Sequence, residues 1–348
     1  QYGLTPQPRK EWLVQPAERG EFYHEVLEAF VRNIPQVQGW PYITQEQTDS
    51  VMDTLIPPSL ERRVGTPFHD NARTRYAVKA MEDVVRRIAW LITKGAQRSE
   101  FVPAMAEVRF GYDIPGSLPP LSLMLGDDST LTVKGLIDRV DRYAGAAGRY
   151  LRVVDYKSRD ESLSGENILA GIQLQLLLYL KAALQMDSRY EAAGAFYQHL
   201  TDPMINTDDA AKAAAETEKE LRYRGIALDD VQVHNLMEDP DQPLSLRTRF
   251  KKDGSPYANQ PLFTQEEIRA FMDFAQYKAG QLADDILAGA VHRRPAVDKQ
   301  GRGPCDYCPY MGICRRDAMD GLRDARLLTP LSLRALADSL VSSSQHQE

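Results

Sequence analysis

Apolar positions recur every three to four residues in the first well-patterned stretch of the chain. Residues 20–34, GEFYHEVLEAFVRNI, place five apolar side chains on one helical face: Tyr23, Val26, Leu27, Phe30 and Ile34. A second helix is predicted from about residue 71 to residue 94, ended by Gly95. Its basic residues are typical either of a solvated face or of a DNA channel, and the pattern leaves both open: Arg73, Arg75, Lys79, Arg86 and Arg87.

The period then shortens, which indicates β-strands. Three stretches separated by Gly, Pro, Asp and Ser read as strands: AEVRFGYDI, LTVKGLIDRVDRY and YLRVVDYKS. The last two are joined by AGAAG, which is typical of a hairpin turn. The apolar residues 168–186 are predicted to form one long buried helix, and residues 192–200 another strand of the sheet.

The C-terminal half alternates helices with irregular segments. A polar helix is predicted over residues 208–224, ended by Gly225. A longer helix follows, opened by a capping box of Thr264 and Glu267 and ended by Gly289. A cysteine segment at about residues 300–316 precedes a short helix and a tail, 342–348, that is expected to be disordered. The pattern predicts one mixed α/β domain over residues 1–341, a mixed sheet flanked by helices.

Composition narrows the class of protein. The chain has 348 residues, 43% hydrophobic and 26% charged, as is ordinary for a globular domain, and no apolar run long enough for a membrane span. The net charge of −7 argues against a general nucleic-acid coat, although it is compatible with a nuclease that has a local basic channel. The start lacks both a signal peptide and a Met, so we expect a fragment of a longer chain. The three cysteines, all between residues 305 and 314, form no disulfide framework of the secreted kind, so we expect a cytoplasmic protein.

The strongest candidate site lies on two neighbouring predicted strands. Asp155 and Lys157 are two residues apart and therefore point to the same face of the sheet, and the preceding strand can bring Asp138 alongside them. Two carboxylates bind a hard ion such as Mg²⁺ or Mn²⁺, which polarises a phosphodiester and lowers the pKa of a bound water. Lys157 can orient or stabilise the resulting hydroxide. Asp141, close to Asp138, ranks second as the metal-binding acid.

A solvent-facing salt bridge between Asp155 and Lys157 is the alternative, and an isolated D-x-K would favour it. Three apolar neighbours on the same predicted strand indicate burial: Leu151, Val153 and Val154. Burying two adjacent acids without a cation is costly, so the context favours a metal site.

Three cysteines within ten residues indicate a second metal centre. Cys305, Cys308 and Cys314 are spaced too closely for a disulfide framework of the secreted kind. An iron–sulfur cluster is one interpretation. Zinc bound by the three thiols and a histidine, of which His292 is the nearest, is the other.

These motifs resemble a known family. The sequence GLIDRVDR…LRVVDYKS…GIQLQLLLYL is similar to RecB-like nucleases of the PD-(D/E)XK superfamily, and more narrowly to AddB-type C-terminal nuclease domains. The resemblance implies a restriction-endonuclease-like fold. It makes Asp138 and Asp155 metal ligands, with Lys157 as the catalytic lysine and the backbone carbonyl of Tyr156 as a further ligand. It also implies that His24, in GEFYHEVLE, completes the metal site.

The resemblance extends to DNA and cofactor binding. Gln175 and Tyr179 lie one helical turn apart, which a local polar pair would also explain, and the family uses this motif to hold DNA. The three cysteines would bind a [4Fe–4S] cluster whose fourth cysteine is expected just upstream of residue 1.

The implied function is Mg²⁺-dependent cleavage of single-stranded DNA in a bacterial helicase–nuclease that resects double-strand breaks for recombination. Since the sequence contains no G-x-x-x-x-G-K-[ST], ATP hydrolysis and unwinding would belong to an AddA-like partner subunit. Two alternatives remain at this point: a stand-alone iron–sulfur exonuclease of the Cas4 kind, and a DNA-binding scaffold with an inactive nuclease site.

Overall fold

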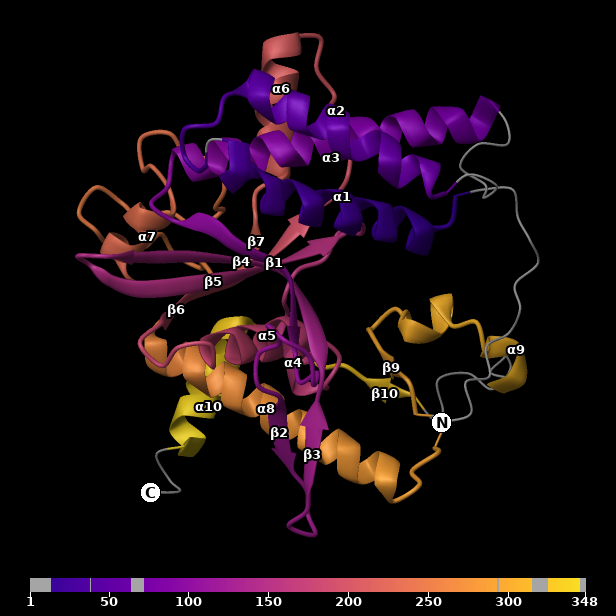
Figure 1. Ribbon diagram of the computed structural model, residues 1–348. Coiled ribbons are helices and arrows are strands. Elements are labelled where there is room, and N and C mark those ends of the chain that lie inside the picture. Colours follow the sequence, from indigo (N-terminus) through magenta and orange to yellow (C-terminus); the bar gives the residue numbers. More distant parts are fainter. Residues whose placement is uncertain (1–13, 38, 64–71, 293, 315–324, 345–348) are drawn as a thin grey trace.

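The centre of the molecule is a six-stranded mixed sheet in the order β1-β4-β5-β6-β7-β8 (Figure 1). The computed structural model describes residues 14–37, 39–63, 72–292, 294–314 and 325–344. The strands β4–β5 and β6–β7 pair antiparallel, as do β1 and β4, whereas β5–β6 and β7–β8 are parallel. Their bounds are Val102–Phe110 (β1), Gly135–Gly145 (β4), Gly148–Lys157 (β5), Glu191–His199 (β6), Arg224–Leu228 (β7) and Leu262–Phe263 (β8).

Helices cover both faces of this sheet (Figure 1). On one side lie α1 (Pro16–Val37), α2 (Gln45–Glu61) and α3 (Ala72–Gln97); on the other lie α4 (Gly165–Leu169), α5 (Gln175–Leu184), α8 (Gln265–Leu287) and α10 (Leu333–Ser344). The five apolar residues predicted for one face of α1 are all buried, and the capping box of Thr264 and Glu267 opens α8 as expected. The mixed sheet flanked by helices that the sequence predicts is therefore confirmed.

Smaller elements extend the two layers. A hairpin of β2 (Leu121–Met124) and β3 (Thr130–Val133) packs its apolar side chains against α8. The remaining elements are α6 (Ala210–Glu220), α7 (Val231–Met237), β9 (Ala296–Val297), η1 (Pro304–Tyr307), α9 (Met311–Cys314) and β10 (Arg326–Leu327), which pairs with β9. Within the described part of the chain, no helix combines the length and apolar character needed to cross a bilayer.

Three helix boundaries differ from the prediction. The long helix expected over residues 168–186 is broken into α4 and α5, because Gly171 takes a left-handed φ of 81°. Gly95 lies inside α3, where a Cβ would come within 2.9 Å of Ser245 Oγ, so the helix continues past this glycine with Ser245 packed close to it. Gly225 lies in strand β7 instead of ending a helix, since α6 already ends at Glu220.

The first part of the expected C-terminal tail is helical. Residues 342–344 belong to α10, in which Ser342 Oγ donates to the carbonyl of Asp338 and Ser343 Oγ to that of Ser339. The rest of the expected tail, residues 345–348, lies outside the described residues. Side-chain hydrogen bonds to the preceding turn therefore help to keep residues 342–344 in the helix.

Candidate metal centre and active site

The site lies where two strands of the sheet diverge. The pairing of β4 with β5 runs from Gly145–Gly148 to Arg139–Val154. Immediately beyond the last pair stand Asp138 and Asp155, both buried. In place of a backbone acceptor, the amide of Tyr156 donates to Asp138 Oδ2 at 2.6 Å. The fork between the strands thus gives two carboxylates room at the end of a well-paired hairpin.

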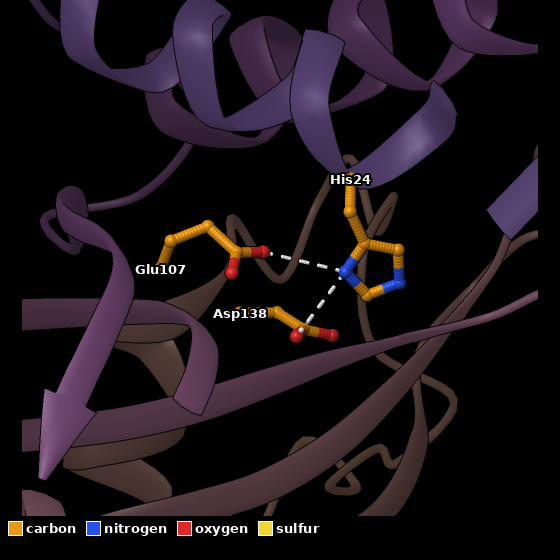
Figure 2. Close-up of side chains that lie close together, drawn as sticks. All are labelled: His24, Glu107 and Asp138. Carbon is orange, nitrogen blue, oxygen red and sulfur yellow. Dashed lines mark hydrogen bonds and ion pairs between the residues drawn. The ribbon is translucent and has the colours of Figure 1, made fainter. Parts of the chain in front are cut away.

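Helix α1 and strand β1 bring two further side chains, His24 and Glu107, to this fork. Figure 2 shows the ring of His24 pointing toward the carboxylates of Glu107 and Asp138. His24 Nδ1 lies 3.3 Å from Glu107 Oε1 and 3.3 Å from Asp138 Oδ1. One nitrogen and two carboxylate oxygens, from these three residues, lie within 4.8 Å of one another. The expectation that His24 belongs beside Asp138 agrees with this geometry.

Glu107 was not identified from the sequence. It lies within a predicted strand, where an acid ordinarily alternates toward solvent. In the structure its φ is 49°, a left-handed conformation uncommon for a residue other than glycine, and β1 has a register shift at residues 103–105. The available signal was an acid inside a mostly apolar strand, and the backbone conformation that directs Glu107 could not be read from the sequence.

The catalytic lysine predicted from the sequence connects the acids to helix α5. Lys157 Nζ lies 2.8 Å from Asp155 Oδ2 and donates to Gln175 Oε1 at 3.0 Å. Gln175 Nε2 in turn donates to the hydroxyl of Tyr179 at 2.7 Å. The break at Gly171 places Gln175 in the first turn of α5, so the structure brings all four of these predicted residues into one connected chain.

The electrostatics of the fork match a cation site. Burial lowers the pKa of His24, but hydrogen bonds to Asp138 and Glu107 outweigh it and raise the pKa to about 10. Burial and the neighbouring Asp138 raise the pKa of Asp155 to about 6, against the opposing effect of Lys157. A protonated imidazole therefore lies between two carboxylates, where a positive charge offsets their repulsion.

The donor set fits a divalent metal ion. Carboxylate oxygens and one imidazole nitrogen are ligands that Mg²⁺ and Mn²⁺ accept. Asp155 Oδ2 is buried and forms an ion pair with Lys157 but no hydrogen bond of good geometry, which leaves it available for coordination. The side chains of His24, Glu107, Asp138 and Asp155 are therefore compatible with the ion that the sequence predicts.

Asp141, the second-ranked acid, has a different environment. It is fully buried and accepts from Arg139 Nε at 2.8 Å and from Arg152 Nε at 3.0 Å. Arg139 also donates to the hydroxyls of Tyr156 and Tyr223. Asp141 thus neutralises buried arginines and is not part of the group around His24.

The cysteines follow one another on a partly exposed segment. Cys305 belongs to η1, Cys308 follows it, and Cys314 ends α9. Cys305 and Cys308 are half-buried and Cys314 is exposed. The fourth cysteine expected upstream of residue 1 lies outside the sequence, and residues 1–13 lie outside the described part of the chain. Three thiols can supply three of the four ligands of an iron–sulfur cluster.

The basic face of α3 is largely paired with acids. Lys79 lies near Asp83, Arg86 near Asp53, and Arg87 near Asp202. These ion pairs favour the interpretation of a solvated face over that of a DNA channel for this part of the helix.

Comparison with known proteins agrees with this geometry. A family model described as the PD-(D/E)XK nuclease superfamily matches residues 1–315. The chain belongs to the PD-(D/E)XK nuclease superfamily. Its mixed sheet and flanking helices fit the fold of these nucleases.

Curated relatives narrow the similarity. The chain is 34% identical over 331 residues to the B subunit of the ATP-dependent helicase/deoxyribonuclease of Moorella thermoacetica. It is 31% identical over 332 residues to the protein of the same name from Alkaliphilus oremlandii. Each alignment covers 91% of this chain and 28% of the relative, so the chain spans about a quarter of the length of these proteins.

Proposed function

We propose that this chain is a Mg²⁺-dependent deoxyribonuclease that hydrolyses phosphodiester bonds of single-stranded DNA. The observation that carries the proposal is the group of His24, Glu107 and Asp138 beside the Asp155–Lys157 pair. A bound divalent ion would polarise the phosphate and lower the pKa of a coordinated water. His24, Glu107, Asp138 and Asp155 would hold it, with the backbone carbonyl of Tyr156 as a further ligand.

The other polar groups of the fork then have defined roles. Lys157 orients the attacking water and stabilises negative charge that develops on the phosphate, because its ammonium lies beside Asp155. Gln175 holds the ammonium in place through its side-chain oxygen and is itself held by Tyr179. Gln175 and Tyr179 line the approach to the fork and contact the DNA backbone.

The relatives' names support a place in a helicase–nuclease. Both proteins are named as the B subunit of an ATP-dependent helicase/deoxyribonuclease, which implies a second subunit. We propose that an AddA-like partner supplies ATP-driven unwinding in the bacterial cytoplasm, and that this chain cuts the strand delivered to it during double-strand break resection. The sequence, which contains no ATP-binding G-x-x-x-x-G-K-[ST] motif, is consistent with this division of work.

Cleavage of end-labelled single-stranded DNA tests the proposal. The protein, its Asp155→Ala variant and an Asp83→Ala control are assayed with Mg²⁺ and with EDTA. Asp155→Ala should lower the rate by about a hundredfold or more, since metal-ion catalysis contributes several kcal/mol. Asp83, an exposed partner of Lys79, should be dispensable.

The outcomes separate the competing functions. Metal-independent cleavage, or an Asp155→Ala variant as active as the wild type, would refute the proposed site. DNA binding without cleavage, even with the partner subunit added, would instead identify an inactive scaffold. Faster cleavage of duplex than of single-stranded DNA would refute the substrate preference alone.

We further propose that Cys305, Cys308 and Cys314 bind a [4Fe–4S] cluster together with a fourth ligand from outside this sequence. The close spacing of the three cysteines along the sequence supports this. Protein prepared anaerobically, with its full natural chain, should contain iron and acid-labile sulfide, and Cys308→Ala should lose both. Zinc in place of iron would contradict the proposal and favour the alternative metal.

A further inference from the structure

Two exposed aromatic rings, each with a cation over it, lie at the ends of the strands that carry the acids. Lys134 Nζ lies 5.7 Å from the centre of the Tyr112 ring, and the guanidinium carbon of Arg159 lies 5.0 Å from that of Tyr307. Tyr112 is 44% exposed and Tyr307 76% exposed. Neither ring belongs to the metal centre or to the Gln175–Tyr179 pair.

Both pairs are close to the catalytic groups along the chain. Lys134 precedes β4 and lies four residues before Asp138, a distance of about 13 Å along an extended strand. Arg159 follows β5 two residues after Lys157, or about 7 Å. These spans correspond to about two to four stacked nucleotides at roughly 3.4 Å each. A DNA strand of a few nucleotides bound at the fork is therefore long enough to reach either ring.

The first pair rests on a well-packed support. Gly111 has a φ of 76°, and a Cβ there would come within 2.7 Å of the carbonyl oxygen of Val133. Gly135 likewise has no room for a side chain, because the Phe110 ring lies against it. Phe110 in turn packs edge-on against Tyr179 at 5.9 Å. Close packing thus connects Tyr112 and Lys134 to Tyr179, one of the residues proposed to hold DNA.

The second pair joins the cysteine segment to the strand of the catalytic lysine. Tyr307 lies between Cys305 and Cys308, in a turn that begins where the Gly303 amide donates to Asp306 Oδ2 at 2.9 Å. Strand β10 contacts the segment between α4 and α5, because Arg326 donates to the carbonyl of Ala170 at 3.0 Å. The cysteine segment is therefore positioned to present Tyr307 beside Arg159.

In the described part of the chain, neither cation is neutralised by an acid. Across the described ranges, no salt bridge links Lys134 or Arg159 to a carboxylate, in contrast to Lys79, Arg86 and Arg87 of α3. Free cations next to exposed aromatic faces are the combination that binds single strands, because the rings stack on bases and the cations contact phosphates. Duplex DNA keeps its bases stacked on each other and does not offer them to such rings.

We propose that Tyr112 with Lys134, and Tyr307 with Arg159, form two stacking positions that bind single-stranded DNA next to the nuclease site. This proposal rests on the proposed function, which it deepens by naming the surface that selects a single strand. Each ring stacks on a base, and each cation binds an adjacent phosphate.

Binding and cleavage are measured separately to test it. Affinity for a labelled oligothymidylate is determined by fluorescence anisotropy in EDTA, in an Asp155→Ala background that does not cut. Tyr112→Ala and Tyr307→Ala should each weaken binding by about fivefold or more, the effect of losing one stacked base. Tyr112→Phe and Tyr307→Phe, which keep the ring, should bind nearly as the parent does.

A matched control exists in the loop between α7 and β8. Lys251 lies over the ring of Tyr257 at 5.9 Å, and Tyr257 is 50% exposed. Tyr257→Ala removes a cation–aromatic pair of the same kind and should leave the affinity unchanged. Equal losses in all three alanine variants, or none in Tyr112→Ala and Tyr307→Ala, would overturn the proposal.

Cleavage by the same variants with Asp155 intact distinguishes this proposal from the underlying one. The alanine variants should raise KM for single-stranded DNA and leave kcat nearly unchanged, since the rings do not contact the reacting phosphate. If the parent binds single strands through the two rings but never cuts, the stacking surface stands and the nuclease proposal fails. If the protein cuts single-stranded DNA but removing the rings changes neither KM nor Kd, the nuclease proposal stands and the stacking surface is refuted.

Discussion

The imidazole of His24 occupies the position between two acids where a metal ion is proposed to bind. Its pKa of about 10 is well above the usual value, so in the metal-free protein the ring is protonated at neutral pH. A metal ion can be coordinated only by the neutral ring. Proton and metal therefore compete for the same small space.

This competition predicts that metal binding releases a proton. Between pH 7 and 9, titration with Mn²⁺ should release about one proton per site, and the affinity should increase up to about tenfold per pH unit. Isothermal titration in buffers of different ionisation heat measures the release. A His24→Ala variant should release none. A wild-type heat that is the same in every buffer would show that the ring does not take part in coordination.

Two buried aspartates on adjacent strands should respond in opposite ways to the same substitution. The pKa of Asp155 is raised to about 6, so its folded value exceeds the unfolded one and its contribution to stability is lost as pH rises from about 4 to about 6. At pH 8 the charged group therefore costs about 2–3 kcal/mol, a net value because the pKa of about 6 already includes the favourable effect of Lys157. Asp141 instead forms buried ion pairs with two arginines, Arg139 and Arg152.

We expect Asp155→Asn to stabilise the metal-free protein at pH 8 by about 1–2 kcal/mol while abolishing cleavage. Asp141→Asn should destabilise it by about 3–5 kcal/mol, because Arg139 and Arg152 lose their buried counter-charge. Urea unfolding in EDTA measures both. The advantage of Asp155→Asn should disappear near pH 4, and a loss of stability in both variants would contradict the assignment of different roles.

At the scale of elements, the break between α4 and α5 positions Gln175 against Lys157. Gly171 allows the chain to turn with a φ of 81° before α5 begins. A Cβ at this position would meet Leu282 Cδ1 at 3.0 Å, in addition to the backbone strain. Substitution here is therefore expected to move the start of α5 and with it Gln175, the hydrogen-bond partner of Lys157.

Gly171→Ala should lower the cleavage rate by about tenfold or more and cost about 1–2 kcal/mol of stability. Gly289→Ala is the matched control: its φ is 74° and no atom lies within 4 Å of the added Cβ, at the end of α8. It should show similar backbone strain without loss of activity. Equal activity of the two variants would show that the break does not position Gln175.

The same elements show how far sequence reasoning extends. Alternation and spacing were sufficient to place Asp138, Asp155 and Lys157 on adjacent strands, because side-chain direction in a hairpin follows directly from the period of two. The apolar run around Gly171 concealed the break, since a buried helix and two shorter ones have the same composition. Glu107 was missed because its direction depends on a left-handed backbone conformation set by the tertiary structure.

The whole molecule carries a net charge of −7, so its overall field repels DNA. Binding must then depend on a few cations close to the site, and Lys134, Lys157 and Arg159 are in place for this. Acids elsewhere act mainly through long-range repulsion, which salt screens within about 10 Å at 0.1 M. The salt dependence of binding therefore reports the number of local phosphate contacts.

With three such contacts, the slope of log K against log salt should be about −2 for a single strand, or about 20-fold weaker binding between 50 and 200 mM. Replacing Lys134 and Arg159 together by Gln should reduce the slope to about −0.7, because only Lys157 still contacts a phosphate. Lys251→Gln with Lys252→Gln, at a distinct pocket of about 400 Å³, removes the same charge elsewhere and should leave the slope unchanged. Parallel slopes for both double variants would mean that net charge, and not these two positions, governs the binding of DNA.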